Sequence, residues 1–324
     1  MIKAEIYQEL INRLIEEQNF KKQPSALYEP IHYVMSQGGK RLRPLLTLLA
    51  CDLFGGDLQK ALYPAMAIEV FHNFTLVHDD IMDKAPLRRG KETVYKKWNS
   101  NIAILSGDTM FAMAYQYAIM TDHAVIPDIL NVFSQTAIEV CEGQQLDMDF
   151  ENMDNVSIPD YIEMIRLKTA VLLGASLKIG AITAGADEFS IQKIYDFGIH
   201  LGIAFQLKDD LLDLYGEFEK FGKMSGGDIL TGKKTYLVLK ALELANSAQQ
   251  TRLKQLYADP ALDPQLKISS VREIFNALQI EQHVSKIMEE FFTKSLADLE
   301  SVNALEASKQ AVREYAYLLF NRNH

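Results

Sequence analysis

Apolar residues recur at helical spacing along the whole chain. Near the start, Ile6, Leu10 and Leu14 fall on one face of a helix, and the stretch 284–299 repeats this pattern near the end. Stretches in which apolar and polar residues alternate, as in a half-buried strand, are hard to find. The pattern therefore predicts an all-α protein.

Glycine and proline residues separate the helical blocks. Two of these blocks have good helix starts: Asp57 precedes an apolar run over 58–82, and Ser157 precedes Pro159 at a first helical turn. No shift in composition and no linker divides the chain. We therefore expect one large helical-bundle domain over residues 1–324, with roughly ten or more helices.

The composition is that of a folded, acidic protein. Of the 324 residues, 48% are hydrophobic and 23% are charged, and the formal net charge is −10 at pH 7. This charge argues against nucleic acid as the main ligand, although a local basic pocket can still bind phosphates. The two cysteines, Cys51 and Cys141, are too few for a disulfide scaffold and suit a reducing cytoplasm.

We expect no membrane span. The first residues include an early acid and lack the apolar core of a signal peptide. The nearest candidate for a span, 170–186, is interrupted by Lys178 and by glycines, so a buried core helix is expected there. These features predict a cytoplasmic protein.

An acidic motif, His78-Asp79-Asp80-Ile81-Met82-Asp83, ends the first of these apolar runs. Asp79 and Asp83 are four residues apart, so they stack on one helical face near the helix end at which the dipole disfavours negative charge. A cation between the two carboxylates would remove this repulsion. Oxygen ligands at this spacing favour Mg²⁺ or another hard cation.

The same spacing recurs in Asp209-Asp210-Leu211-Leu212-Asp213, again after an apolar helical run. Either motif alone is readily explained as an exposed acidic helix end. Two copies are harder to explain in that way, and helices that face each other would bring both motifs to one cavity. Metal ions bound there would hold a diphosphate and stabilise it as a leaving group.

Basic residues lie near these motifs in the sequence. Lys40, Arg41 and Arg43 surround a glycine turn just before a predicted helix, where donors can converge on an anion, although basic loops are often simply solvated. Arg88 and Arg89 follow the first motif closely enough to line the same cavity, or else they form a surface pair that neutralises nearby acids.

Three lysines suit a similar role. Lys168, followed by Thr169, lies in an apolar helix, where its ammonium group must reach the surface or find an anion. Lys223 and Lys233 lie in a glycine-rich stretch after the second motif. This stretch lacks the spacing of a P-loop and is interpreted either as a mobile lid over phosphate or as a merely disordered loop.

The ordered set of motifs resembles the trans-type isoprenyl diphosphate synthases, also called the polyprenyl synthetase family. Each piece alone is weak, whereas the set in this order is highly specific and covers nearly the whole chain. The matching pieces are Gly39-Lys40-Arg41-Leu42-Arg43-Pro44, His78 to Asp83, Arg88-Arg89-Gly90, Gly107-Asp108, Gly143-Gln144, Lys168-Thr169, Gly202 with Phe205-Gln206 and Asp209 to Asp213, and Gly232-Lys233 with Thr235-Tyr236.

The resemblance implies an all-α bundle around a deep central cavity, usually in a homodimer, that acts as a Mg²⁺-dependent prenyltransferase. Its substrates would be isopentenyl diphosphate and an allylic diphosphate (dimethylallyl, geranyl or farnesyl). The reaction would ionise the allylic diphosphate, join the carbocation to the isopentenyl double bond, and end with proton removal by the departing diphosphate.

The resemblance also implies residue roles. Asp79, Asp83 and Asp209 would hold three Mg²⁺ ions on the allylic diphosphate, supported by Asp80, Asp210 and Asp213. Direct contacts to that diphosphate would come from Arg88, Lys168, Lys223 and Lys233. Isopentenyl diphosphate would be held by Lys40, Arg43, His72 and Arg89, although a histidine on an apolar helix is as readily a packed core residue. Thr169 and Gln206, with Lys168, would lie near the developing cation.

Product length is expected to depend on Phe74, five residues before Asp79, and on Phe71, about one helical turn further from Asp79 and so deeper in the cavity. In the family that this sequence resembles, an aromatic residue at the position of Phe74 accompanies short products. The motif also lacks a two-residue insertion, as in geranylgeranyl synthases of the archaeal kind. We predict C15 to C20 products with a lean to C20, unless Phe74 simply packs in the core.

Three alternatives remain at this point. A longer-chain polyprenyl diphosphate synthase would share all the motifs. A terpene cyclase of the same fold usually replaces the second aspartate motif with an Asn/Ser/Glu-type triad, and a non-catalytic subunit typically loses acidic motifs. Both motifs are intact here, which favours chain elongation.

Overall fold

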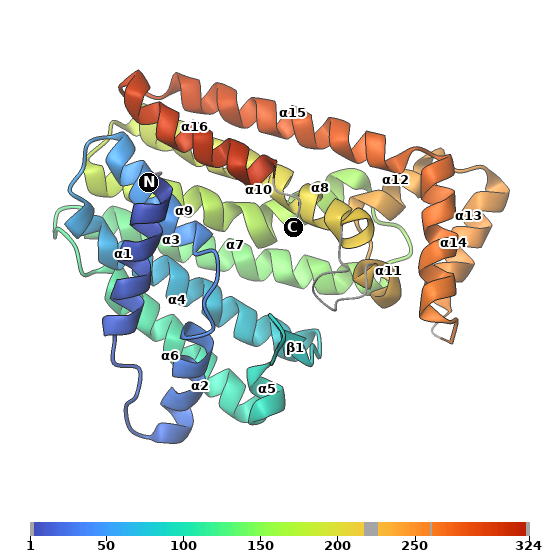
Figure 1. The fold of residues 1–324 in the computed structure, drawn as a ribbon, viewed down its shortest axis with the longest axis horizontal. Helices are drawn as coiled ribbons and strands as arrows, with labels where there is room; N and C mark the ends of the chain where they lie inside the picture. The colour runs from blue at the N-terminus through green and yellow to red at the C-terminus, as the bar shows by residue number, and fades with distance from the viewer. Residues whose placement is uncertain (1–2, 217–225, 260, 322–324) are drawn as a thin grey trace. The chain divides into compact units, whose positions relative to one another are not determined.

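The computed structural model describes residues 3–216, 226–259 and 261–321, of which 79% are helical (Figure 1). The prediction of an all-α protein is confirmed. The elements in chain order are α1 (Lys3–Glu17), α2 (Ser25–Met35), α3 (Leu42–Leu53), α4 (Leu58–Met82), β1 (Leu87–Arg88), β2 (Lys91–Glu92), α5 (Val94–Lys97), α6 (Ser100–Ala118), α7 (Ile126–Asn152), α8 (Ile158–Ile165), the π-helical segment η1 (Arg166–Ala170), α9 (Val171–Ala184), α10 (Glu188–Tyr215), α11 (Gly227–Thr231), α12 (Tyr236–Leu244), α13 (Ser247–Ala258), α14 (Pro264–Ala277), α15 (Ile280–Ser301) and α16 (Glu306–Phe320).

The chain forms two compact units, which are described separately. The first unit contains Met1–Gln135, Ala175–Tyr195 and Val302–Val312, and the second contains Thr136–Gly174, Asp196–Ser301 and Arg313–His324. The expectation of one domain over residues 1–324 stays a prediction.

Both predicted helix starts are confirmed. Asp57 is the N-cap of α4, and its carboxylate accepts a hydrogen bond from the backbone N–H of Gln59 at 2.9 Å. Ser157 is the N-cap of α8 and forms a capping box with Asp160. Each cap satisfies backbone donors that the first turn of a helix leaves without partners.

In the first unit, the middle of α4 is buried on every side. All residues over 64–71 are buried, including Glu69, and the helix packs against α3 and α6. A helix that is apolar around its whole circumference is stable only when neighbours surround it. This packing fixes α4 firmly and so fixes the position of the acidic motif at its C-terminal end.

A short hairpin, β1 paired with β2, follows α4 and was not expected from the sequence. The turn between the strands consists of Arg89 and Gly90, whose φ angles are 53° and 74°. Two successive positive φ values are typical of the tight hairpin turn that matches the twist of two strands. Because each strand has only two residues, the alternation of side chains that announces a strand has no room to appear.

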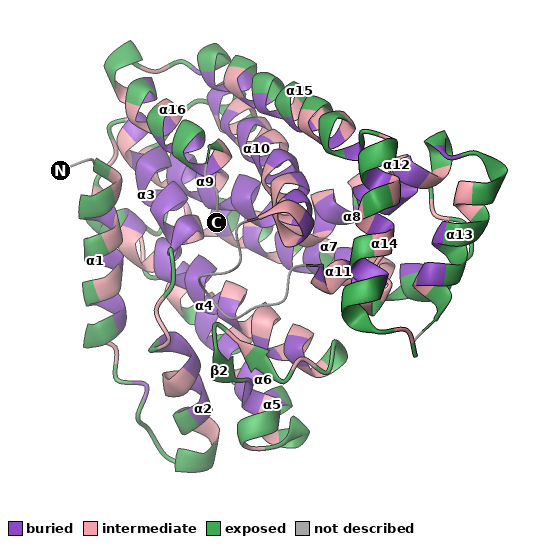
Figure 2. Cartoon of the chain, turned by 45° about the vertical axis from the view of Figure 1, so that its right-hand side comes forward, coloured by how far each residue is buried: buried purple, intermediate pink, exposed green. Residues whose placement is uncertain are grey.

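In the second unit, α13 and α14 lie side by side, and α14 also packs against α15 (Figure 1). Figure 2 shows that α15 is buried along one face and exposed along the other. Of the apolar residues that the sequence pattern placed on one face, Val284 and Leu299 are buried, whereas Ile287, Phe291 and Leu296 are half-buried, because the buried face is centred on Val284, Met288 and Phe292.

Among the described residues, only the stretch Ile158–Ala184 has the length and apolarity of a membrane span. However, 72% of its most apolar window is buried inside the protein. Such burial is that of a core helix, as expected for 170–186.

Candidate active-site residues

The first acidic motif lies in the first unit, at the end of α4. Asp80 is only 4% exposed, Asp79 is half-buried, and Asp83 is the exposed C-cap residue whose N–H donates to the carbonyl of Asp79 at 2.8 Å. The second aspartate of the motif therefore points inward, while the first and third lie closer to solvent.

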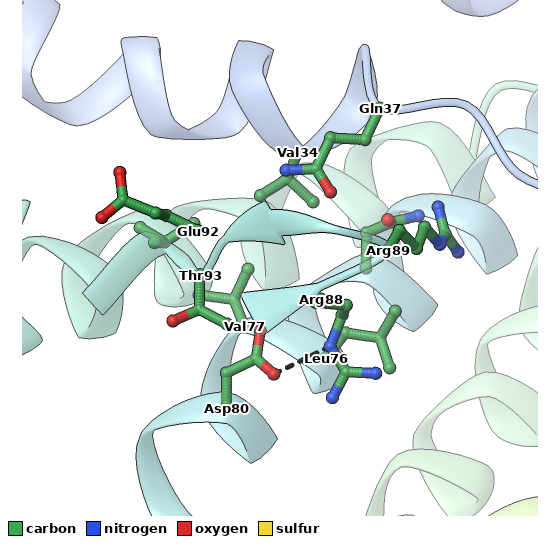
Figure 3. A pocket seen from close by; sticks show the side chains of 11 residues that line it. Val34, Gln37, Leu76, Val77, Asp80, Arg88, Arg89, Glu92 and Thr93 are labelled. Atoms are coloured by element: carbon green, nitrogen blue, oxygen red, sulfur yellow. Dashed lines mark hydrogen bonds and ion pairs between the residues drawn. The ribbon is translucent and has the colours of Figure 1, made fainter. Parts of the chain in front are cut away.

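Arg88 contacts two of these carboxylates, and Figure 3 shows its contact with Asp80. Its Nε donates to Oδ1 of Asp80 at 2.8 Å, and its Nη2 donates to Oδ2 of Asp79 at 3.2 Å. The hairpin places Arg88 there, since β1 ends at this residue. Arg88 is thus paired with the acids of the motif, as in the alternative in which it neutralises nearby acids.

The charge of Arg88 does not fully compensate this acidic cluster. Burial raises the pKa of Asp80 to about 6, Arg88 acts in the opposite direction, and the charges of Asp79 and Asp83 add to the rise. Further positive charge would therefore be favourable at the end of α4.

Arg89 extends away from Asp80, in contrast to its neighbour Arg88 (Figure 3). Its Nη1 donates to the carbonyl of Gly38, and its guanidinium lies under Gly39, where an added Cβ would lie 2.9 Å from Nη1. This contact joins the hairpin to the glycine turn. A cavity of about 20 Å³, room for about one water molecule, lies beside Asp80, Arg88 and Arg89.

The three cations of the glycine turn have different environments. Lys40 is exposed, whereas Arg41 is 5% exposed and has a left-handed backbone, with φ of 47°. Arg41 forms an ion pair with Glu69 at 2.5 Å and donates to the carbonyl of Met35 at 2.8 Å. Arg41 therefore holds the turn in place, and Lys40 and Arg43 remain the candidates for anion binding.

Arg43 contacts His72, as a shared site would require. The distance from Nη1 of Arg43 to Nε2 of His72 is 3.1 Å. Burial, together with the positive charges of Arg43 and the neighbouring arginines, lowers the pKa of His72 well below its usual value. His72 is thus a neutral, partly buried histidine with a specific arginine partner.

Phe74 and Phe71 belong to an aromatic cluster between α4 and α6. The ring centroid of Phe74 lies 5.6 Å from that of Phe71, 5.1 Å from that of Phe111 and 4.7 Å from that of His78. Phe71 is 1% exposed, whereas Phe74 is only partly buried. Phe111, which the sequence did not single out, is the further aromatic residue of α6 in contact with both.

The second acidic motif lies in the second unit, on α10. As in the first motif, the second aspartate is buried: Asp210 is 5% exposed, while Asp209 and Asp213 are half-buried. Asp210 accepts hydrogen bonds from the hydroxyl of Tyr161 and, at 3.0 Å, from the amide of Gln206. Burial and the charge of Asp228 raise the pKa of Asp210 to about 7.

Thr169 continues this network. Its hydroxyl donates to Oε1 of Gln206 at 3.0 Å, so a chain of hydrogen bonds connects Thr169, Gln206, Asp210 and Tyr161. The amide of Gln206 is oriented by this chain, because its oxygen accepts from Thr169 and its nitrogen donates to Asp210. The predicted pair Thr169 and Gln206 is in direct contact.

Lys168 lies in the π-helical segment η1, and its ammonium group forms an ion pair with Asp147. Its Nζ lies 2.6 Å from Oδ2 of Asp147 on α7, and Nζ of Lys233 lies 3.6 Å from the same oxygen. Gly143 allows this approach, since an added Cβ there would lie 2.3 Å from the backbone nitrogen of Lys168. Lys223 lies outside the described residues.

Asp228 joins the second motif at the first turn of α11. Its N–H donates to Oδ2 of Asp213 at 3.0 Å, and its carbonyl accepts from the N–H of Lys233 at 2.8 Å. Burial raises the pKa of Asp228 to about 6; Lys233 acts against the rise, and the charges of Asp213, Asp147 and Asp209 contribute to it. Negative charge thus also accumulates near the second motif.

The donor set fits Mg²⁺ that shares its ligands with a substrate. Within the part of the chain that the structure describes, no group of three His, Cys, Asp or Glu side chains is arranged to hold a metal ion. Mg²⁺ commonly takes one or two carboxylates and completes its shell with phosphate oxygens and water. Asp79 with Asp83, and Asp209 with Asp213, each provide such a pair of hard oxygen ligands four residues apart on one helix.

Three residues of these hydrogen-bond and ion-pair networks were not predicted from the sequence as site residues: Asp147, Tyr161 and Asp228. Asp147 could have been found, because it lies one helical turn after Gly143 and an apolar helix that holds a lysine needs an acid nearby. Asp228 and Tyr161 give no comparable signal, since their importance depends on contacts with residues distant in the chain.

The sequence matches the profile of the polyprenyl synthetase family over residues 24–277. A geranylgeranyl pyrophosphate synthase from Geoglobus acetivorans is 39% identical over 318 residues, which cover 97% of each chain. A crystal structure of a geranylgeranyl pyrophosphate synthase superposes with a TM-score of 0.94 at 44% identity and covers 100% of both chains. A polyprenyl synthase from Caulobacter crescentus CB15, in complex with calcium and isoprenyl diphosphate, superposes with a TM-score of 0.88 at 29% identity and covers 99% of this chain and 96% of that chain.

The chain therefore belongs to the polyprenyl synthetase family. This finding confirms the resemblance carried by the ordered motifs and the prediction of a prenyltransferase. The names of the relatives also agree with the predicted short-chain prenyl diphosphate synthesis and its lean to C20.

Proposed function

We propose that the protein is a Mg²⁺-dependent prenyl diphosphate synthase that adds isopentenyl diphosphate head-to-tail (1′-4) to allylic diphosphates and releases mainly geranylgeranyl diphosphate. The observation that carries this proposal is the contact of Arg88 with Asp79 and Asp80. An arginine beside the metal-binding carboxylate of Asp79 suits a metal–diphosphate complex, since this carboxylate can take the metal while the guanidinium, held by Asp80, reaches phosphate oxygens.

The metal ligands of the proposal are the aspartates of both motifs. Asp79, Asp83 and Asp209 bind three Mg²⁺ ions together with the allylic diphosphate, and Asp213 supports them. Asp80 and Asp210 are buried and hydrogen-bonded to Arg88 and to Tyr161 with Gln206, so they orient the motifs from inside. When bound, Mg²⁺ neutralises the diphosphate and makes it a better leaving group.

The cations Arg88, Lys168 and Lys233, with Lys223, bind the allylic diphosphate and stabilise the negative charge that it gains as its bond to carbon breaks. Thr169, Gln206 and Lys168 face the developing carbocation, where an amide oxygen and a hydroxyl stabilise positive charge by their dipoles. The departing diphosphate takes the final proton, so no side chain has to serve as the base.

Isopentenyl diphosphate is held by Lys40, Arg43, His72 and Arg89. A neutral His72 suits this role, because it orients Arg43 without competing for the negative charge of the diphosphate. Arg89 and the glycine turn are already joined through the carbonyl of Gly38, so their donors are fixed relative to each other.

Phe74, backed by Phe71 and Phe111, limits the length of the growing chain. Its partly exposed ring in a cluster of aromatic neighbours suits a rigid stop, since the ring has little room to move aside. The product is therefore C15 to C20, mainly C20.

We further propose that the enzyme works as a homodimer in the cytoplasm. The homodimer rests on the family resemblance. The cytoplasmic location is supported by two free cysteines, of which Cys51 is buried and Cys141 is exposed.

Incubation of the protein with Mg²⁺, isopentenyl diphosphate and each allylic primer tests this function. We expect linear all-trans prenyl diphosphates that stop at C20, identified by mass spectrometry, and no product after chelation of the metal. Longer products would identify a longer-chain synthase, cyclic hydrocarbons a terpene cyclase, and no products a non-catalytic subunit.

A further inference from the structure

In the second unit, the carboxylate of Asp147 forms ion pairs with two ammonium groups. Its Oδ2 lies 2.6 Å from Nζ of Lys168 and 3.6 Å from Nζ of Lys233. The side chain of Asp147 is 14% exposed, and those of Lys168 and Lys233 are 22% and 35% exposed. The three groups therefore meet in a partly desolvated place, where charge interactions are stronger than at the surface.

The two lysines belong to separate elements, and both of them contact Asp147 of α7. Lys168 belongs to η1, whose backbone packs directly against Gly143 of α7. Asp147 lies one turn further along α7 and holds the side chain of the same lysine. Lys233 follows α11, and its own N–H donates to the carbonyl of Asp228 at 2.8 Å.

The charge balance explains why the pair needs this carboxylate. Burial alone would raise the pKa of Asp147, but the charges of Lys233 and Lys168 outweigh burial and the pKa lies below its usual value. Asp147 is therefore ionised. Two ammonium groups that lack a shared counterion repel each other and spread apart, whereas a carboxylate between them holds them together with a net charge of one.

We infer that Asp147 is a positioning residue that holds Lys168 and Lys233 as a preformed pair, ready to bind the oxygens of one diphosphate. The inference rests on the proposed function, in which both lysines bind the allylic diphosphate. Donors already in place stabilise a leaving group without reorganisation at the moment of reaction.

The effect on kinetics should be asymmetric. The negative charge of Asp147 weakens the attraction of the lysines for the substrate, while the geometry that it imposes favours the transition state. Asp147→Asn removes both effects. The KM for the allylic diphosphate should therefore stay within about threefold of wild type, while kcat falls by roughly 10- to 100-fold, as is typical of small misplacements of catalytic groups.

A double-mutant cycle tests whether Asp147 acts through the lysines. Asp147→Asn is measured in the wild-type protein and in a background with both Lys168→Met and Lys233→Met, using labelled isopentenyl diphosphate for sensitivity. In that background the same substitution should lower kcat less than about threefold. A similar loss in both backgrounds would overturn the inference, since a structural role acts whether or not the lysines are present.

Two further variants complete the experiment. Asp149→Asn removes an exposed carboxylate on the same helix, which accepts a hydrogen bond from Gln145, and should leave kcat unchanged. Asp147→Glu keeps the charge and should recover most of kcat; recovery no better than that of Asp147→Asn would count against the inference. If the wild-type protein incorporates no isopentenyl diphosphate, the proposed function and the inference both fall. An active wild type with an additive cycle refutes only the inference.

Discussion

The Nη1 atom of Arg43 lies 3.1 Å from Nε2 of His72. A guanidinium group only donates hydrogen bonds, so Nε2 accepts and the imidazole carries its proton on Nδ1. The lowered pKa of His72 agrees with a neutral ring. This neutral state has a consequence for stability, because the unfolded chain binds a proton at this residue more readily than the folded protein does.

We predict that His72 makes the protein less stable in mild acid. Below a pH of about 6.5, the ordinary pKa of histidine, the unfolded state gains a proton that the folded state lacks, so the free energy of unfolding falls as the pH falls. Relative to His72→Gln, which keeps an acceptor for Arg43, wild type should lose about 1 kcal/mol between pH 7.5 and pH 5.5. Urea unfolding at both pH values measures this loss, and parallel pH profiles of the two proteins would contradict it.

Much of the fold could be predicted from residue pattern alone. The caps at Asp57 and Ser157 follow from short-range rules, and the structure has them where they were expected. The hairpin around Arg89 could not be predicted, since its strands are too short for a periodic signal.

The candidate site could be predicted where a charged residue lies in an apolar helix or in a cluster of like charges. Lys168 in an apolar helix had either to reach the surface or to find an anion, and only the structure shows that it pairs with Asp147. Arg41 belongs to the same basic turn as Lys40 and Arg43, yet its partner is the buried Glu69. Sequence shows that such charges need partners, whereas which partner each one takes depends on contacts between distant segments.

Asp79→Ala should abolish condensation and leave the fold intact. The substitution removes a metal ligand, and Arg88 keeps its hydrogen bond to Asp80. We expect a loss of at least about 10³-fold in kcat, since the charge of the leaving group is no longer neutralised. Asp128→Ala, an exposed acid in the first turn of α7, serves as a control that keeps full activity. Near-normal turnover of Asp79→Ala, with an unchanged circular dichroism spectrum, would contradict the role of this residue.

Phe74→Ala should lengthen the products. The ring of Phe74 contacts Phe71 and Phe111, and its removal leaves space in this cluster for further isoprene units. The expected result is a shift from C20 towards C25 and longer chains in the mass spectrum of the products. Phe189→Ala removes a ring that is 53% exposed and should leave the products unchanged. A product spectrum identical to that of wild type would show that another residue sets the length.

Gly143→Ala should destabilise the protein and lower its activity together. The new Cβ would lie 2.3 Å from the backbone nitrogen of Lys168, so α7 and η1 must separate. Such overpacking typically costs about 1–3 kcal/mol. Thermal unfolding and steady-state kinetics measure the two effects, with Cys141→Ala as an exposed control on the same helix. An unchanged melting temperature would mean that the two helices are not in this tight contact.

The most direct test of chain elongation is the ratio of pyrophosphate released to isopentenyl diphosphate consumed, with farnesyl diphosphate as primer and Mg²⁺ present. Head-to-tail condensation predicts one pyrophosphate for each isopentenyl unit and a C20 diphosphate as the product. Release of pyrophosphate from farnesyl diphosphate without consumption of isopentenyl diphosphate would contradict the proposed function, as would the absence of any release.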